Sequence, residues 1–245
     1  MQPDNIYQKE FSILSYHLNP SGRARMTTLA NFFQEMAYQH ANRLGFGYRD
    51  LKKESHLWVL SRMKIHVIRY PVWDETVTLE TWHRGMERLF GMRDFRIRDA
   101  QGSDLALAES AWLIVDAATR RPVRTPDPSF LNTTRDEKVF QTPLEKITLP
   151  ENMENMGTHT VVHSDLDVVG HVNNVKYMEW CIDALIGPGQ PEERIDALEI
   201  NFMHEAHPGE KVSISVREGG SGVHFFAGHL ERGEKEVFRA LLHLT

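Results

Sequence analysis

The feature of this sequence that most constrains its fold is an internal repeat. The stretch IHVIRYPVWDETVTLETW, residues 65–82, aligns without a gap over INFMHEAHPGEKVSISVR, residues 200–217, so that Tyr70 lies over Glu205. Each stretch follows a segment with helical periodicity and belongs to a series of strand-like runs. Because a repeated unit of this size is a supersecondary structure, the repeat predicts two copies of one motif.

Both halves of the chain show the same succession of predicted elements. Apolar side chains at helical spacing predict a long helix over residues 27–44 and a second one over residues 172–185. Thr27 or Thr28 is a suitable cap for the first helix. The runs with strand character that follow the helices are residues 57–70, 75–84, 90–99, 105–116, 197–204, 211–217, 223–231 and 237–244.

A long helix followed by antiparallel strands, repeated once, predicts an α+β protein made of two tandem hot-dog domains. In each domain a curled antiparallel β-sheet would wrap around the long helix. The two copies in one chain would imitate the dimer that single-copy proteins of this fold make. We expect an N-terminal hot-dog domain over residues 1–125, a linker rich in proline and charge over 126–155, and a C-terminal hot-dog domain over 156–245.

Composition excludes several classes of protein. The chain has 245 residues and a net charge of -6, which argues against a general nucleic-acid binder because such proteins need a basic surface. Its start, MQPDNIYQKEF, does not have the pattern of a signal peptide, and no segment has the apolar length of a membrane span. The single cysteine, Cys181, lies in an apolar helical stretch and is expected to be a buried structural thiol in a reducing compartment. We therefore expect a cytoplasmic protein without membrane insertion.

A dense polar cluster, HSDLDVVGHVNNVKYMEW at residues 163–180, occurs only in the second copy. Asp167, His171 and Asn173 precede the predicted helix, and Asn174 lies just inside it. The first turn of a helix carries unpaired N–H groups and positive potential, so it suits polar caps and also a carbonyl oxygen that acquires charge. Alternatively, the asparagines are caps alone and Asp167 and His171 only bond each other. Asp165 is expected to be a turn residue.

Glu205 adds a candidate general base to this cluster. It is predicted to end a strand of the second copy, and a sheet that wraps the helix would bring it to face Asp167 and His171. One acid could then take a proton from water while the other groups orient the water and polarise a carbonyl. Alternatively, Glu205 ends its strand in solvent and has no such role.

The segment DLDVVGHVNNVKY closely resembles the DLD-x-x-x-HVNNVKY signature of acyl-ACP thioesterases. The similarity extends to WVLSRMKIHVIRYPVWDETVTLETW and SAWLIVDAATRRPVRTP in the first half. The resemblance implies hydrolysis of a fatty acyl chain carried by acyl carrier protein, with the catalytic groups in the second half. It places Asp167 and His171 on the family's catalytic aspartate and histidine, and Glu205 on an acid of its active site.

Two positions depart from the family's pattern. Val169 stands where the family has an asparagine between the catalytic aspartate and histidine, and Ala206 stands where it often has a cysteine. The second departure indicates that no thiol nucleophile is required. Because valine cannot bond water or a carbonyl, the role of the missing amide would pass to Asn173, Asn174 or backbone N–H groups.

The mechanism that we predict is direct hydrolysis by activated water. Glu205, helped by Asp167, would activate the water, while His171 and the helix N-terminus would stabilise the oxyanion. Asp167 as the base or as a transient nucleophile is the alternative. The alternatives for the whole protein are an acyl-CoA thioesterase, a non-catalytic or weakly active acyl-thioester binding protein, and a hot-dog dehydratase or hydratase.

The remaining predictions concern ligands and partners. Asn174, Trp58 and Met63 are candidates for substrate binding, and the first half is expected to supply the acyl pocket, although its apolar residues Phe32, Met36, Leu60, Met63 and Trp58 may be ordinary core. We predict no organic cofactor and no metal ion, because His204 and His207 lack the helical geometry of known zinc motifs. The expected partner is acyl-loaded acyl carrier protein, which is acidic and would dock on Lys52 and Lys53 or on Arg120, Arg121 and Arg124. The protein is expected to be a monomer or a homodimer.

Overall fold

The chain divides between Leu144 and Glu145 into two units. The structure, a computed structural model, describes residues 5–123, 134–187 and 190–245. None of the helices among these residues is both long enough and apolar enough to cross a membrane.

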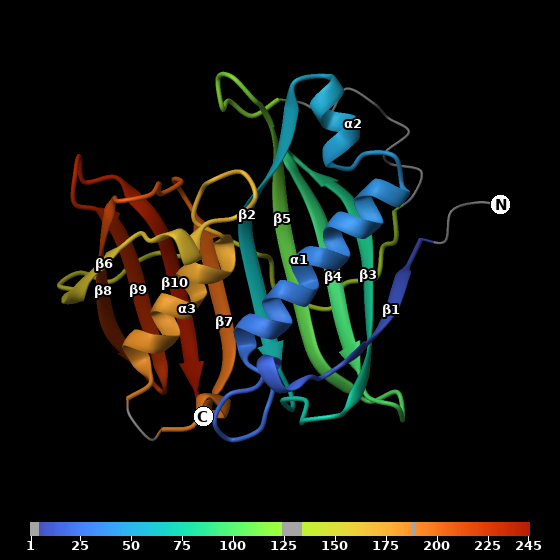
Figure 1. The fold of residues 1–245 in the computed structure, drawn as a ribbon, viewed down its shortest axis with the longest axis horizontal. Coiled ribbons are helices and arrows are strands. Elements are labelled where there is room, and N and C mark those ends of the chain that lie inside the picture. The colour runs from blue at the N-terminus through green and yellow to red at the C-terminus, as the bar shows by residue number, and fades with distance from the viewer. Residues whose placement is uncertain (1–4, 124–133, 188–189) are drawn as a thin grey trace. The chain divides into compact units, whose positions relative to one another are not determined.

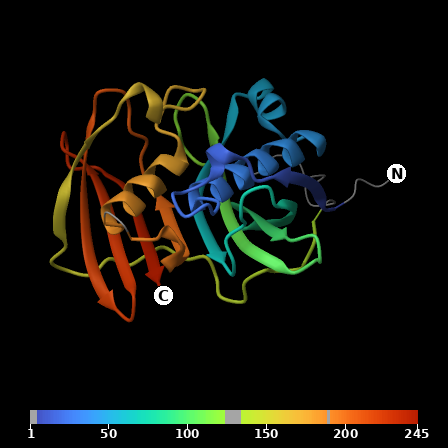
Figure 2. The same cartoon turned by 60° about the horizontal axis from the view of Figure 1, so that its bottom comes forward.

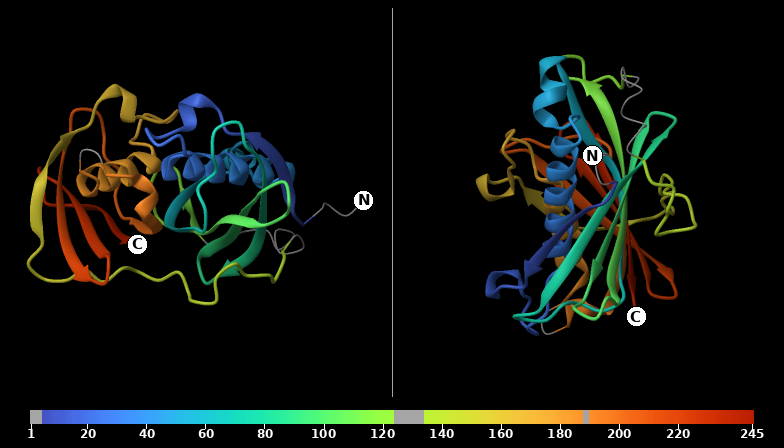
Figure 3. Two further views of the ribbon diagram at one scale, coloured as in Figure 1. Left: turned by 90° about the horizontal axis from the view of Figure 1, so that it is seen from below. Right: turned by 90° about the vertical axis from the view of Figure 1, so that its right-hand side faces the viewer.

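The first unit is a helix against an antiparallel sheet. Its sheet has the order β1-β3-β4-β5-β2, and each described neighbouring pair is antiparallel. The helix α1 lies along one face of this sheet (Figure 1), and the sheet curves around it (Figure 3). The elements in chain order are β1 (Tyr7–Ser12), the 3₁₀ helix η1 (Ser15–His17), α1 (Met26–Arg43), α2 (Tyr48–Lys53), β2 (His56–Val67), β3 (Thr76–Glu87), β4 (Phe90–Arg98) and β5 (Asp104–Asp116).

The second unit repeats this topology. Its sheet has the order β6-β8-β9-β10-β7, again antiparallel, and α3 lies against it (Figure 2). The predicted architecture, a long helix wrapped by a curled antiparallel sheet in each half, is confirmed. The elements are β6 (Glu154–Thr160), η3 (His163–Asp165), α3 (Asn174–Leu185), η4 (Glu192–Arg194), β7 (Ile195–Phe202), β8 (Lys211–Gly220), β9 (Val223–Leu230) and β10 (Glu236–Leu244).

The cores lie between each helix and its sheet. On α1, Leu29 and Phe33 are fully buried, and the Phe33 ring packs on Phe95 of β4 with centroids 5.1 Å apart. On α3, Met178 and Cys181 are fully buried. Burying one such large apolar side chain contributes about 1.5–3 kcal/mol, so the apolar stripe fixes which face of each helix meets the sheet. Burial also raises the pKa of the Cys181 thiol, as expected of a structural cysteine.

Some elements differ from the prediction. The strands β1 and β6 were not predicted as strands in their own right, because most of their side chains are exposed and give no apolar alternation. The short helix α2 occupies a segment that interrupts the long-helix pattern. The strand β7 ends at Phe202, so Glu205 lies in the following loop and does not end the strand. Regular pairing stops there because two successive N–H groups, those of Met203 and His204, share the carbonyl of Val237.

The segment predicted as a linker, residues 126–155, is bound to both units where it is described; its residues 126–133 lie outside the described residues. The Trp82 indole donates a hydrogen bond to the carbonyl of Glu137 at 2.8 Å in the first unit. The Ile147 N–H donates to the Asn201 side-chain oxygen at 2.6 Å in the second. The change of unit falls between these anchors.

Candidate active site

The loop before α3 is held closed by the Asp167 carboxylate. Its Oδ1 accepts hydrogen bonds from the N–H groups of Val169 at 3.0 Å and His171 at 3.2 Å. The Asp167 N–H donates in turn to the His171 carbonyl at 2.8 Å. Gly170 adopts a φ of +83°, the left-handed conformation that glycine tolerates best. Asp167 therefore has a structural role that is independent of any chemistry.

The first unit contains the same loop with an asparagine in place of the aspartate. Asn19 Oδ1 accepts from the N–H groups of Ser21 at 3.0 Å and Arg23 at 3.2 Å. The Asn19 N–H donates to the Arg23 carbonyl at 2.8 Å. The loop thus needs a side-chain oxygen but no charge, and what is specific to the second unit is the negative charge of Asp167.

The loop that carries Glu205 is fixed to α3 through its neighbour Ala206. The Ala206 N–H donates to the Tyr177 hydroxyl oxygen at 3.1 Å, and the Ala206 carbonyl accepts from the Val172 N–H at 3.1 Å. In the first unit Pro71 takes the place of Ala206 and accepts the corresponding backbone bond at 2.8 Å, but proline has no N–H. The bond to Tyr177 is therefore an additional anchor of the second unit.

His171 and Glu205 come together at the start of α3. His171 Nδ1 lies 3.4 Å from Glu205 Oε1, with 24% and 37% of the two side chains exposed. The His207 ring meets the His171 ring edge to face, with centroids 4.9 Å apart. These three side chains form a cluster that is open to solvent and can hold a proton or a cation. His207 was not predicted as a site residue, because in the sequence it was weighed only together with His204, as a metal pair that was rejected.

None of this cluster is repeated in the first unit. The shared backbone bonds and the sequence repeat match its three positions to Arg23, Tyr70 and Val72. A cation, a phenol and an aliphatic side chain cannot replace two imidazoles and a carboxylate as proton acceptors. Among the described residues, the cluster of His171, Glu205 and His207 therefore has no counterpart at the matching positions of the first unit.

The carboxylates around this site affect the pKa of the Tyr177 hydroxyl. Burial is the main reason why the pKa of its hydroxyl is raised, and the hydrogen bond from Ala206 opposes the shift. The carboxylates of Glu205, Glu210 and Asp167 raise this pKa further. The negative charges of Glu205 and Asp167, the two predicted catalytic acids, therefore both favour the protonated form of the buried Tyr177 hydroxyl.

The two asparagines occupy the first positions of α3. Asn173 is the N-cap, and its side-chain oxygen accepts from the Val175 N–H at 2.9 Å. Its own N–H donates to the Asp165 carbonyl at 2.8 Å. Asn174 is the first residue of the helix. Asp165 is buried, and its carboxylate accepts from the Val162 N–H at 2.8 Å, as expected of a turn residue.

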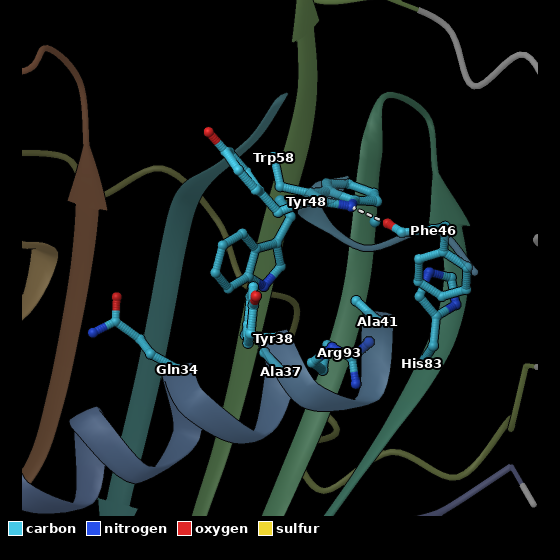
Figure 4. A pocket seen from close by; sticks show the side chains of 11 residues that line it. Gln34, Ala37, Tyr38, Ala41, Phe46, Tyr48, Trp58, His83 and Arg93 are labelled. Carbon is cyan, nitrogen blue, oxygen red and sulfur yellow. Dashed lines mark hydrogen bonds between the residues drawn. The ribbon is translucent and has the colours of Figure 1, made fainter. Parts of the chain in front are cut away.

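The first unit contains a cavity of about 220 Å³ between the C-terminal half of α1 and the sheet. Trp58 lines it, and its indole N–H donates to the Phe46 carbonyl at 2.9 Å (Figure 4). Met63 is fully buried and does not belong to the lining. Gly91 lets the Trp58 ring lie close to β4, because a Cβ there would be 3.1 Å from the ring. The lining residues are Gln34, Ala37, Tyr38, Ala41, Phe46, Tyr48, Trp58, His83, Gly91, Arg93 and Trp112.

A buried guanidinium borders this mostly aromatic cavity. Arg93 is 4% exposed, and its Nη1 lies 2.9 Å from His40 Nδ1 and 3.2 Å from Thr81 Oγ1. Burial lowers the pKa of Arg93 to about 9. It also lowers the pKa values of His40 and His83 to about 3, so both imidazoles are neutral at pH 7. This group was not predicted from the sequence, because Arg93 lies in a strand with three other charged residues and has no motif around it.

The basic residues predicted to dock a carrier protein are exposed where they are described. Lys52 lies over the Tyr48 ring at 5.5 Å, and Lys53 pairs with Asp50 at 3.2 Å. Arg120 and Arg121 are exposed, and Arg124 lies outside the described residues.

Comparison with known proteins identifies the family. The family model described as the acyl-ACP thioesterase N-terminal domain matches residues 4–130, and that of the acyl-ACP thioesterase C-terminal domain matches residues 150–241. The chain belongs to the acyl-ACP thioesterase family. This membership confirms the resemblance seen in the sequence.

Individual members of the family are moderately similar to the chain. Oleoyl-acyl carrier protein thioesterase 2 of Arabidopsis thaliana is 30% identical over 83% of this chain and 59% of its own length. Palmitoyl-acyl carrier protein thioesterase of Gossypium hirsutum is 29% identical over 84% of this chain and 53% of its own length. Both are chloroplastic, and the chain spans little more than half of their length.

Solved structures of the family share the whole fold. An acyl-ACP thioesterase from Bacteroides thetaiotaomicron VPI-5482 superposes with a TM-score of 0.88 at 27% identity, over 98% of each chain. The 12:0-ACP thioesterase from Umbellularia californica gives a TM-score of 0.83 at 25% identity, over 98% of this chain and 97% of that one. The predicted hot-dog fold is thereby confirmed.

Proposed function

We propose that this protein is a thioesterase that hydrolyses fatty acyl-[acyl carrier protein] to a free fatty acid and the carrier-protein thiol. The observation that carries the proposal is the contact of Glu205 with His171 at the start of α3, 3.4 Å apart. The pair occurs in the second unit and not at the matching positions of the first. Family membership supports the same reaction.

In the proposed mechanism Glu205 is the general base. Its carboxylate takes a proton from a water molecule, whose oxygen attacks the carbonyl carbon of the thioester. His171 and the N–H groups at the start of α3 stabilise the oxyanion of the tetrahedral intermediate. When the intermediate collapses, the carbon–sulfur bond breaks and the departing thiolate takes the proton held by Glu205. Asp167 supports the base by its charge and by holding the loop; Asp167 as the base itself or as a transient nucleophile remains the alternative.

We assign the acyl pocket to the first unit and the catalytic groups to the second. The cavity beside Trp58 supports this assignment, because its aromatic and alanine lining offers an apolar surface for an alkyl chain. Met63 would act only through the core behind that lining. Replacing Gly91 by Val would displace the Trp58 ring into the cavity. The variant is expected to shift the preference toward shorter acyl chains in an assay with thioesters of graded length.

We propose acyl carrier protein as the macromolecular partner, bound through exposed cations such as Lys52, Lys53, Arg120 and Arg121. Attraction between an acidic carrier and these cations weakens as salt screens the charges. The rate with acyl carrier protein is therefore expected to fall with added salt more steeply than the rate with acyl-CoA. Equal salt dependence would favour an acyl-CoA thioesterase. We also propose that the protein is a monomer or a homodimer and that it is located in the cytoplasm.

The decisive test removes each charge while keeping its shape. Glu205→Gln and Asp167→Asn are each expected to lower kcat by about 10²–10⁴-fold, as for loss of a general base and its support. Asp167→Asn should leave the fold intact, because Asn19 closes the same loop in the first unit. Glu218→Gln, at an exposed position of β8, is the control. Near-normal kcat in both site variants would refute the mechanism.

A non-catalytic acyl-binding protein is the second candidate, favoured by one observation. Val169 is half-exposed on the closed loop and occupies the place of the family's asparagine. Purified protein incubated with acyl thioesters separates the two functions. Release of free fatty acid supports the enzyme, whereas saturable binding without release supports the binding protein.

A further inference from the structure

We propose that His171, Glu205 and His207 form a binding site for a divalent transition-metal ion such as Zn²⁺. Each side chain offers one ligand atom, and the three ligand atoms lie within 4.8 Å of one another. Two imidazoles and one carboxylate are a donor set that suits zinc and leaves a fourth position open.

The distances in the cluster are close to those of a metal site. Zinc bonds of about 2.0–2.2 Å in tetrahedral geometry place neighbouring ligand atoms about 3.3 Å apart. His171 Nδ1 and Glu205 Oε1 already have a separation of 3.4 Å. Only His207 needs to move closer, and its side chain is exposed. The edge-to-face contact of the two rings places the two imidazoles next to each other, although they come from different loops.

The backbone that carries these ligands is held in place. Glu205 and His207 flank Ala206, which is fully buried and is bonded to both Tyr177 and Val172. The His207 N–H donates to Glu210 Oε2 at 2.7 Å. A metal ion would therefore bind to a loop whose main chain is already ordered, and only side-chain freedom would be lost.

The structure also explains why the sequence did not reveal the site. In the sequence, His204 and His207 were weighed as a pair of metal ligands. In the structure, His204 Nδ1 lies 2.7 Å from the Glu236 carbonyl oxygen on β10. The second imidazole comes instead from His171, in the loop before α3. The sequence-based prediction was that no metal ion is bound, and the site proposed here uses a different pair of histidines, His171 and His207.

A bound ion would inhibit hydrolysis. It would occupy the Glu205 carboxylate, which is assigned to water activation, and would hold the His171 imidazole, which is assigned to oxyanion stabilisation. This consequence depends on the proposed function, whereas the binding of the metal does not. The two can therefore be tested separately.

The test uses untagged, metal-free protein. Titration with Co²⁺ is followed by its visible absorption, and titration with Zn²⁺ by calorimetry, for the wild type, His207→Ala, Glu205→Gln and the control His204→Ala. The wild type and the control should bind one ion per chain with tetrahedral Co²⁺ absorption. Loss of His207 or Glu205 should weaken binding by at least about tenfold, since even outer partners of metal ligands are worth 10–100-fold. Unchanged affinity in both variants, or no binding by the wild type, would overturn the proposal.

Inhibition is measured as free fatty acid, because released thiol would itself bind zinc. Each variant's rate with Zn²⁺ is divided by its own metal-free rate, and a chelator is added to check reversal. Zinc should inhibit the wild type and His204→Ala at concentrations where His207→Ala is at least about tenfold less sensitive. Equal sensitivity of the wild type and His207→Ala would refute inhibition through this site. Absence of hydrolysis in the metal-free wild type would count against the proposed function, and the Co²⁺ and Zn²⁺ titrations would still decide on the site.

Discussion

Replacing Tyr177 by Phe tests whether the hydrogen bond from the Ala206 N–H to the Tyr177 hydroxyl contributes to stability and to catalysis. The substitution removes one oxygen and keeps the ring, so the contacts of this ring with Trp180 and Phe238, at 5.1 Å and 5.4 Å between centroids, are retained. What is lost is the acceptor of the Ala206 N–H. Because Ala206 is fully buried, no bulk water replaces that acceptor.

The expected loss of stability follows from the unsatisfied donor. A buried polar group left without a partner costs about 1–3 kcal/mol, so the free energy of unfolding should fall by that amount. The loop that carries Glu205 would also lose its hydrogen bond to α3 and keep only the bond from the Val172 N–H. Small displacements of a catalytic group can cost up to about 10²-fold in rate, and we expect kcat to fall by about tenfold.

The measurements are urea denaturation and steady-state hydrolysis, with Tyr16→Phe, at a side chain that is 76% exposed, as the control. A second variant isolates the cause. Pro71 stands at the matching position of the first unit, so adding Ala206→Pro to Tyr177→Phe removes the unsatisfied N–H. The double variant should recover stability relative to Tyr177→Phe without recovering kcat. Unchanged stability and unchanged kcat in Tyr177→Phe would refute the reasoning.

Three further predictions follow from the structure. Asn173→Ala should cost about 0.5–2 kcal/mol of unfolding free energy in urea denaturation, because the cap of α3 is lost, whereas Asn173→Asp should retain most of it. Val169→Asn should raise kcat by about threefold to tenfold, the equivalent of one net hydrogen bond, and no gain would show that other groups already fill the role. Burial raises the pKa of Glu109 to about 7, above that of an unfolded glutamate, so the folded state binds this proton more tightly. The contribution of Glu109 to the free energy of unfolding therefore falls as the pH rises from 4.5 to 7. The melting temperature of Glu109→Gln minus that of the wild type should therefore increase across that range, and a flat difference would contradict the assignment.

The pH prediction has a structural reason in the first unit. Arg84 pairs with both Glu109 and Asp94, and all three side chains are almost fully buried. One guanidinium cannot neutralise two buried carboxylates, so the pair holds a proton more tightly than free acids do. Burial likewise raises the pKa of Asp94 to about 6.

The repeat in the sequence predicted the fold down to individual residues. The alignment placed Glu75 over Glu210, and the two glutamates make the same contact: each accepts from the N–H group three residues before it, at 2.9 Å and 2.7 Å. Helices and central strands were predictable because they bury continuous apolar faces. The edge strands β1 and β6 were not, because an exposed strand is defined by its backbone pairing and leaves little pattern in the side chains.

The site was only partly predictable. A conspicuous run of polar residues pointed to Asp167 and His171, and Glu205 was predicted from its expected place at the end of a strand that faces the start of the helix. His207 was paired with the wrong histidine, His204, because the sequence does not show that the loop before α3 brings His171 next to it. Arg93 was missed because local sequence does not show whether a charged strand residue faces the solvent or the interior.

The two units together separate what the fold requires of Asp167 from what the chemistry requires. Asn19 shows that an amide oxygen closes the loop as well as a carboxylate does. Asp167→Ala would remove the loop's acceptor and the charge together, so a loss of activity in that variant would not distinguish a displaced His171 from a missing acid. Asp167→Asn keeps the acceptor and removes only the charge. A large fall in kcat in Asp167→Asn, with unchanged stability, would therefore assign a chemical role to the carboxylate, whereas activity retained in Asp167→Asn but lost in Asp167→Ala would reduce Asp167 to the structural role that Asn19 already has.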